Sequence, residues 1–220
     1  MFATEKQLVK KLRVNYKEIC CWNLEKSKTQ ILEEVDLGFG IADLVISQVN
    51  KAAFVKDELG HFDILIYKVI SDSKKASFLN IIEKTKANQL QVRRSLHKLQ
   101  MNGYIDSKDE LFRAKRSYSH VISKSVAVEA KLKDWKRALN QAFRYRWFAS
   151  QAFVVLDSKY SLPAVKNLSH FKKMNVGLAV IDLDGLLTVH FKPKIERPIN
   201  ESMSILLSEQ VKLSLLGKKK

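Results

Sequence analysis

The chain has 220 residues, of which 46% are hydrophobic and 28% charged, a balance typical of a folded globular protein with one large domain or two small ones. Only 7 glycines and 3 prolines are present, which excludes a collagen-like or low-complexity chain. Lysines and arginines number 39 against 23 acidic residues, so the net charge is +16, and we expect a polyanion as partner: nucleic acid first, and an anionic membrane surface second.

The N-terminal segment predicts a capped helix and not a secretory leader. Thr4 stands at a cap position, Leu8 and Leu12 recur at helical spacing, and an acidic residue occurs early without an apolar run. The adjacent Cys20 and Cys21 rarely close a disulfide and lack the further ligands of a zinc site, so we interpret them as reduced thiols. No stretch approaches the ~18 apolar residues of a membrane span, and we expect a soluble, cytoplasmic protein. Of the two polyanionic partners we expect nucleic acid and no membrane.

Short β-type runs at residues 31–35 and 41–46, separated by two glycines, predict a hairpin. Apolar patterns at helical spacing follow over residues 62–70, 78–82 and 90–99. The third pattern stops at Asn102-Gly103, and a compact hairpin comes next. Three helices followed by a β-hairpin resemble a winged helix-turn-helix over about residues 61–116.

From residue 123 onward, strand patterns alternate with helix patterns, which indicates a mixed α/β domain. We expect strands over residues 126–132, 153–156, 176–181 and 186–191, and helices over residues 134–148, 162–174 and 200–216. Three lysines, residues 218–220, form a basic tail.

The segment from residue 126 to 131 places two charged side chains together. Glu129 and Lys131 share one side of the expected strand because side chains alternate with period two. A carboxylate there can hold a hard cation such as Mg²⁺, and a lysine can orient water or offset phosphate charge. Alone, the pair is better explained as a solvated strand face. Asp43, an acid within the apolar run 41–46, is costly to bury unless it is paired or metal-bound, and adding it favours a metal site.

These residues resemble the PD-(D/E)XK, or restriction-endonuclease-like, nuclease superfamily. The likeness rests on Asp43, on Glu129-x-Lys131, and on a Q-A-x-x-Y motif on the next helix, which places Gln141 and Tyr145 on one helix face. It covers roughly residues 1–50 and 120–200. It implies a mixed sheet flanked by helices, Mg²⁺ as cofactor with Mn²⁺ as a substitute, and these five residues as the catalytic set.

The spacing of the acids departs from that superfamily, because 86 residues separate Asp43 from Glu129 and no proline precedes Asp43. The winged-helix pattern accounts for most of the interval. We therefore expect a discontinuous nuclease-like domain, residues 1–58 and 118–220, carrying an inserted winged helix-turn-helix, residues 59–117. A further metal-binding acid from the first helix is common in some branches. Its candidates are Glu5 first, then Glu33 and Glu34.

The basic residues fall into groups that match a DNA-binding surface. Polar and basic side chains interleave with leucines on the third helix of the insert, as in a recognition helix: Gln89, Gln91, Arg93, Arg94 and Lys98. At the wing, residues suited to phosphate contacts are Arg113, Lys115 and Arg116. A third group lines the helix after the Glu129 strand: Lys133, Lys136, Arg137, Arg144 and Arg146. The alternative for the recognition-helix residues is a solubilising helix face.

Together these patterns predict a metal-dependent DNA endonuclease that docks duplex DNA through the winged helix. One alternative is a DNA-binding regulator or assembly protein whose nuclease fold is inactive. A weaker one is a nuclease acting on RNA, which the winged helix disfavours. A homodimer is one expected assembly, since cutting both DNA strands needs two sites.

Overall fold

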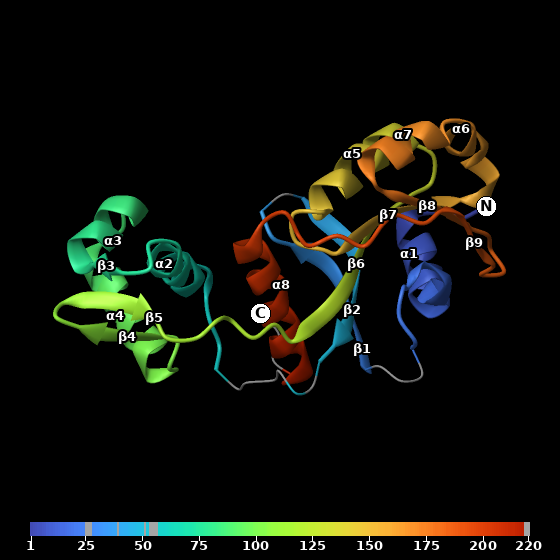
Figure 1. Cartoon of the computed structure of the whole chain (residues 1–220). Coiled ribbons are helices and arrows are strands. Elements are labelled where there is room, and N and C mark those ends of the chain that lie inside the picture. Colours follow the sequence, from blue (N-terminus) through green and yellow to red (C-terminus); the bar gives the residue numbers. More distant parts are fainter. Residues whose placement is uncertain (25–27, 39, 51, 53–56, 218–220) are drawn as a thin grey trace. The chain divides into compact units, whose positions relative to one another are not determined.

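The computed structural model describes residues 1–24, 28–38, 40–50, 52 and 57–217, so the expected basic tail lies outside the described residues. The chain forms two compact units (Figure 1). The first, here called the sheet unit, comprises residues 1–50 and 122–204, and the second, the helical unit, comprises residues 51–121 and 205–220.

The helical unit differs from the expected insert at its C-terminal end. Residues 205–220 belong to it, whereas the sequence placed them with the nuclease-like domain. The reason is packing: Ile205 is fully buried in the core of the helical unit, and the Val121 backbone N–H donates to Ser208 Oγ at 2.9 Å.

The sheet unit is built on a six-stranded mixed sheet in the order β1-β2-β6-β7-β8-β9. The strands are β1 (Lys28–Asp36), β2 (Ile41–Val49), β6 (Ile122–Lys131), β7 (Gln151–Asp157), β8 (Gly177–Ile181) and β9 (Leu187–Phe191). β6, β7 and β8 run parallel, and the other neighbouring pairs are antiparallel. The architecture is therefore α/β with a mixed sheet flanked by helices, as the sequence predicted.

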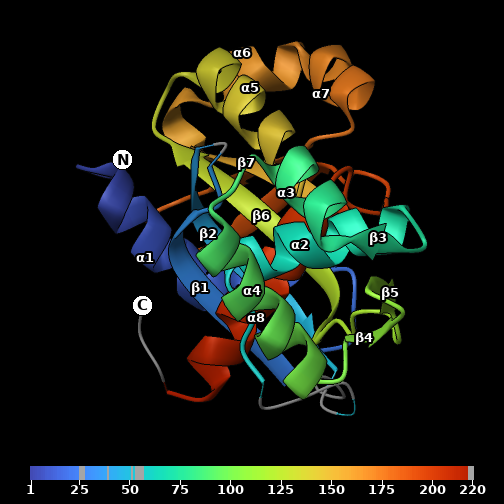
Figure 2. The same ribbon diagram turned by 90° about the vertical axis from the view of Figure 1, so that its left-hand side faces the viewer.

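Helices cover both faces of this sheet (Figures 1 and 2). α1 (Glu5–Asn15), followed by the 3-10 turn η1 (Tyr16–Ile19), lies on one face. On the other lie α5 (Trp135–Tyr145), α6 (Leu162–Lys166) and α7 (Leu168–Met174), with the 3-10 turn η3 (Ser158–Tyr160) before α6. The sequence predicted one helix over 162–174. It is interrupted at Asn167, whose side chain donates to the Pro163 carbonyl at 2.8 Å.

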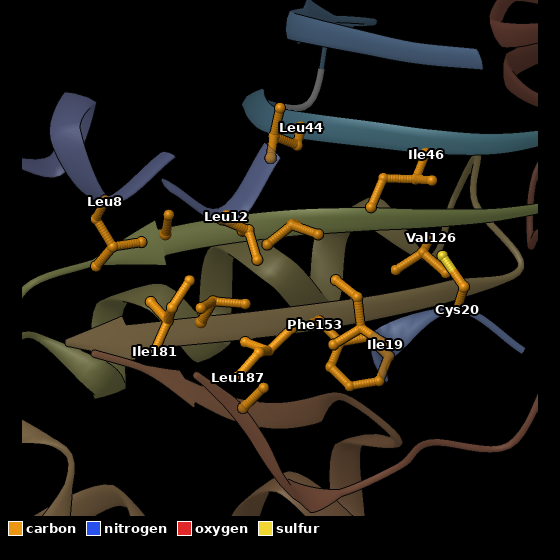
Figure 3. Packing of buried hydrophobic residues seen from close by; sticks show 14 of the residues in the cluster. Leu8, Leu12, Ile19, Cys20, Leu44, Ile46, Val126, Phe153, Ile181 and Leu187 are labelled. Carbon is orange, nitrogen blue, oxygen red and sulfur yellow. The ribbon is translucent and has the colours of Figure 1, made fainter. Parts of the chain in front are cut away.

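The core of the sheet unit forms where α1 packs on the sheet (Figure 3). Leu8 and Leu12 of α1 belong to one buried cluster with Leu44 of β2 and Phe153 of β7, and all four are fully buried. Each such side chain contributes roughly 1.5–3 kcal/mol through burial. The helix begins where Thr4 predicted, since the Thr4 side chain accepts a hydrogen bond from the Gln7 backbone N–H at 3.2 Å. The Thr4 cap thus sets where α1 begins, and the packing of its leucines holds the helix against the sheet.

The helical unit combines helices with a three-stranded antiparallel sheet in the order β3-β5-β4 (Figure 2). Its elements are α2 (His61–Asp72), β3 (Ala76–Ser77), α3 (Phe78–Thr85), α4 (Gln89–Met101), β4 (Ile105–Lys108), β5 (Leu111–Ala114) and the part of α8 (Glu201–Leu215) from residue 205 onward. β3 has only two residues, too few to give a sequence pattern.

One expected core residue of α4 is exposed. Val92, Leu96 and Leu99 are buried, but Leu90, which the sequence grouped with them, is 57% exposed. α4 begins at Gln89, and Asn88 caps it by accepting from the Leu90 backbone N–H at 2.8 Å. Leu90 therefore lies in the first turn, on a side of α4 that the core does not cover.

A buried carboxylate joins α2 to α4. Asp63 accepts hydrogen bonds from the Gly60 backbone N–H at 2.8 Å, from the Ser95 hydroxyl, and from Lys98 Nζ at 2.7 Å. Burial by itself would raise the pKa of Asp63, but the bonds to Lys98, Ser95 and Gly60 outweigh it and lower this pKa. The ionised form is therefore stabilised in the folded protein.

We expect Asp63→Asn to reduce the free energy of unfolding by about 2 kcal/mol at pH 7, the scale of hydrogen bonds to a charged group. Because the folded-state pKa lies below the unfolded value of about 3.9, the wild-type advantage is complete above that pH and is lost as the pH falls toward the folded-state pKa. Urea unfolding at pH 7 and pH 3 measures both effects.

The control for this prediction is Asp72→Asn on the same helix. Asp72 pairs with Lys68 at 2.9 Å but its side chain is 66% exposed, so its loss should cost at most about 0.5 kcal/mol. Equal destabilisation by the two variants at pH 7 would contradict the role assigned to Asp63.

Candidate active site

The antiparallel pairing of β2 with β6 brings Asp43 and Glu129 together. Leu44 lies opposite Val128. Because the strands are antiparallel, Asp43, which precedes Leu44, and Glu129, which follows Val128, are also cross-strand neighbours. Both acids point away from the face on which Leu44 and Val128 join the α1 core. Asp43 Oδ2 accepts a hydrogen bond from the Ala130 backbone N–H at 2.7 Å, which fixes its carboxylate against β6.

Glu129 is 1% exposed, and both of its carboxylate oxygens have partners. Oε1 lies 3.1 Å from Lys131 Nζ. Oε2 accepts from the hydroxyl of the fully buried Tyr145, whose oxygen also lies 2.6 Å from the Ile41 carbonyl oxygen. Burial, followed by the bond to Glu129, raises the pKa of Tyr145, so the hydroxyl stays protonated as a donor. Tyr145 thus links the end of β6, through Glu129, to the start of β2, through Ile41.

Lys131 links the sheet to α1. Its Nζ lies 2.9 Å from Glu5 Oε2 and 3.1 Å from Glu129 Oε1. Burial alone would lower the pKa of Lys131, but the bonds to Glu5 and Glu129 outweigh it and raise this pKa. Lys131 is therefore held as a cation at neutral pH.

The three candidates for a further acid have different positions. Glu5, the first residue of α1, reaches the site through its bond to Lys131. Glu33 pairs instead with Arg13 at 2.7 Å, and Glu34 is an exposed residue of β1 with a φ of 52°. The sequence suggested Glu5 as a metal ligand, and in the structure its carboxylate contacts the lysine of the site.

The site carries more negative charge than its lysine balances. Burial raises the pKa of Asp43 to about 6; the Ala130 N–H opposes this rise, while the nearby charges of Glu129 and Glu5 add to it. A carboxyl group that is costly to ionise in this way gains from a bound cation. The raised pKa of Asp43 is therefore what is expected of a carboxyl group in a cation-binding site.

The donor set fits Mg²⁺, which is commonly bound by one or two carboxylates completed by waters and substrate phosphates. Among the described residues, no three His, Cys, Asp or Glu side chains are arranged to hold a metal ion. Lys131 and Tyr145 each contact one of the Glu129 oxygens, so the site is not a metal site closed by protein ligands alone. Asp43 and Glu129 suit the smaller, water-completed type of site.

α5 places the remaining candidates of this group. Gln141 lies one turn before Tyr145, and its Oε1 atom is buried without a hydrogen-bond partner among the described residues. Such an orphaned amide oxygen costs roughly 1–3 kcal/mol. Lys133, two residues before the helix, and Arg137, in its first turn, are exposed.

A glycine contact was not apparent from the sequence. Gly40 has a φ of 110°, and a Cβ atom there would lie 3.4 Å from the Arg144 guanidinium. Arg144 is exposed and rests against this turn, beside Tyr145. The two glycines of the hairpin signalled a turn, but nothing in the local pattern linked them to α5.

The expected DNA-binding residues of the helical unit divide by their contacts. Lys98 and Arg116 serve internal contacts: Lys98 bonds to Asp63, and Arg116 lies 4.1 Å over the Tyr104 ring and donates to the Asn102 carbonyl at 2.9 Å. Arg93 lies 4.5 Å over the Phe78 ring but is exposed. Side chains that are also exposed are Gln89, Gln91, Arg94, Arg113 and Lys115.

Both cysteines are free thiols, as predicted. Cys20 is buried, and burial, followed by the charge of Cys21, raises its pKa to about 12. A thiol with that pKa stays protonated at neutral pH, so Cys20 is not an activated nucleophile.

Comparison of the chain with protein-family models, with curated proteins and with solved structures gives no match. In the described parts of the chain, no helix combines the length and apolar character needed to cross a membrane.

We expect Tyr145→Phe to lower the free energy of unfolding by about 1–3 kcal/mol, because it leaves Glu129 Oε2 buried without its donor. Urea unfolding measures the loss. Tyr160→Phe is the control, since among the described residues the Tyr160 hydroxyl donates to the weakly accepting Met1 sulfur alone, and its removal should change stability by less than about 0.5 kcal/mol. Similar values for the two variants would show that the Tyr145 hydroxyl does not stabilise the site.

Proposed function

We propose that the protein is a Mg²⁺-dependent DNA endonuclease of the PD-(D/E)XK type, with a restriction-endonuclease-like sheet and an inserted winged helix-turn-helix that docks duplex DNA. The observation that carries the proposal is the juxtaposition of Asp43, Glu129 and Lys131 at one end of paired strands, with Tyr145 bonded to Glu129. The element order supports it, since α1 precedes β1-β2-β6 and α5 connects β6 to the parallel β7.

The helical unit supports the second half of the proposal. Its order α2-β3-α3-α4-β4-β5, with β3 paired to the β4–β5 hairpin, matches the order expected of a winged helix. α4 would be the recognition helix, with Gln91, Arg93 and Arg94 exposed on it and Arg113 and Lys115 on the wing. The net charge of +16 favours a phosphate-bearing partner.

In this mechanism Asp43 and Glu129 would hold the metal ion. When bound, Mg²⁺ supplies charge neutralisation at the scissile phosphate and an activated water. The chain's own residues supply position: the Ala130 N–H fixes Asp43, and Tyr145 fixes Glu129. Lys131 acts as a cation and not as a base, since its bonds to carboxylates raise its pKa. Its ammonium offsets the negative charge that develops on the phosphate.

One observation favours a second function, a DNA-binding protein with an inactive nuclease fold. Lys131 bonds to Glu5 and Glu129 together, and this ion-pair network by itself neutralises part of the charge that a metal would neutralise. The two functions differ in metal binding. Calorimetric titration with Mn²⁺ should give a binding signal in the wild type that is lost in Asp43→Ala; absence of any wild-type signal would favour the inactive fold.

We expect Glu129→Gln to reduce the single-turnover cleavage rate of DNA in Mg²⁺ by roughly 10²–10³-fold, the scale reported for losing one principal electrostatic group, while DNA affinity stays near the wild-type value. Lys131→Ala should act in the same way. Matched controls are Glu34→Gln, an exposed acid of the sheet unit, and Lys124→Ala on the same strand as Lys131. Wild-type cleavage by Glu129→Gln, or no cleavage of plasmid or branched DNA by any form, would overturn the nuclease proposal.

We expect the double variant Arg93→Ala/Arg94→Ala to weaken duplex binding by about 1–3 kcal/mol for each arginine that contacts a base, and by less for phosphate contacts. The cleavage rate at saturating DNA should change little, because the carboxylates lie in the other unit. Binding isotherms and single-turnover rates test this. The double variant Lys74→Ala/Lys75→Ala makes the same charge change off α4 and serves as control. Unchanged affinity in the arginine variant would exclude α4 as the docking surface.

A further inference from the structure

A basic and aromatic patch lies at the sheet edge where β6 and β7 end. The two strands are parallel, with Lys131 opposite Leu156, so they end at the same edge. The chain that leaves β6 carries Lys133, and the chain that leaves β7 carries Lys159 and Tyr160 in η3. Lys133 is two residues beyond Lys131, a chain distance of at most ~7 Å. The patch therefore adjoins the candidate active site.

Two ammonium groups converge on the Tyr160 ring. Lys133 Nζ lies 4.4 Å from the ring centroid and Lys159 Nζ lies 5.8 Å from it. Both lysines are exposed, and within the part of the chain that the structure describes no ion pair joins either of them to a carboxylate. Two like charges beside one ring repel each other, and an anion placed between them would relieve this.

The backbone segment that carries Tyr160 is fixed by hydrogen bonds. Asp157, 1% exposed at the end of β7, accepts from the Lys159 backbone N–H at 2.9 Å and from the Phe2 backbone N–H at 2.8 Å, which orders η3. The Tyr160 hydroxyl donates to the Met1 sulfur at 2.8 Å. A segment that is ordered before binding loses little entropy when a ligand stacks on the ring it carries.

A cationic and aromatic surface of this kind suits an unpaired nucleotide. Exposed cation–π contacts are weak, so phosphates can take over the lysines, and a base can then stack on the ring. In a duplex the bases are stacked within the helix and offer no free face, whereas each base of a single strand does. We infer that Tyr160, Lys133 and Lys159 bind an unpaired stretch of DNA, and that the preferred substrate carries a single-stranded end, flap or gap beside Asp43 and Glu129. This inference rests on the proposed nuclease function for its position in catalysis, but the binding itself is testable without cleavage.

The test measures fluorescence anisotropy with the full chain in EDTA, where no metal-dependent cleavage takes place. The probes are a single strand of about 12 nucleotides, within the usual range of such sites, and a blunt duplex of the same sequence. Tyr160→Ala should weaken single-strand binding by roughly 5- to 150-fold, the equivalent of losing stacking on one base, and leave duplex affinity unchanged. Tyr160→Phe keeps the ring and should bind within about twofold of the wild type.

The lysines give a second readout through the salt dependence of binding. Lys133→Ala and Lys159→Ala should each reduce the slope of log affinity against log salt by about 0.7 for the single strand, since each removes one phosphate contact. Lys166→Ala, an exposed lysine of α6, is the matched control and should leave the slope unchanged.

Unchanged single-strand affinity in Tyr160→Ala, or equal weakening for the duplex, would overturn the inference. Tighter binding of an RNA strand of the same sequence, lost in Tyr160→Ala, would overturn its assignment to DNA. If Tyr160→Ala fails to fold, Tyr160→Leu keeps the apolar volume without the aromatic face and gives the same comparison. Single-strand binding through Tyr160 without any cleavage would support this site and contradict the nuclease proposal. Cleavage without Tyr160-dependent single-strand binding would support the nuclease proposal and contradict this site.

Discussion

The pairing of β2 with β6 is the constraint on which the candidate site depends. These strands are far apart in the chain, and the intervening segment folds into the helical unit with its own core. Loop-closure entropy grows slowly, by about 0.6 kcal/mol for each doubling of length, so a folded insert between two paired strands is tolerated. The register that sets Leu44 opposite Val128 then decides that Asp43 and Glu129 are neighbours. A shift of one residue would turn Asp43 to the other face of β2.

That pairing also buries charge, which the surrounding residues must balance. Glu129 is almost fully buried, and it is stable there because Lys131 and Tyr145 bond to its two oxygens. The charge of Asp43 is only partly stabilised. The hydrogen bond from the Ala130 N–H favours the ionised carboxylate, but burial and the neighbouring acids make ionisation costly. Uneven balance of this kind is typical of sites whose residues are arranged for chemistry and not for stability.

The basic residues of the chain do not all serve one binding surface. Several basic residues have internal partners: Lys98 bonds to Asp63, Arg146 pairs with Glu196, and Lys212 lies 2.7 Å from Glu209. Lys133 and Lys159 have an aromatic ring in place of a carboxylate. A count of lysines and arginines in the sequence therefore indicates the class of partner, but the contacts of each side chain decide which cations remain available to it.

The sequence by itself determined the features that depend on local spacing. Period-two alternation placed Glu129 and Lys131 on one strand face, a threonine before an apolar helical pattern located the start of α1, and alternating patterns indicated the α/β class. Tertiary structure decided what depends on packing between distant segments. It brought Glu5 to Lys131 and Tyr160 to Lys133, it exposed Leu90, and it moved residues 205–220 into the helical unit. Such contacts join residues far apart in the chain, and no spacing along the sequence encodes which buried surfaces will meet.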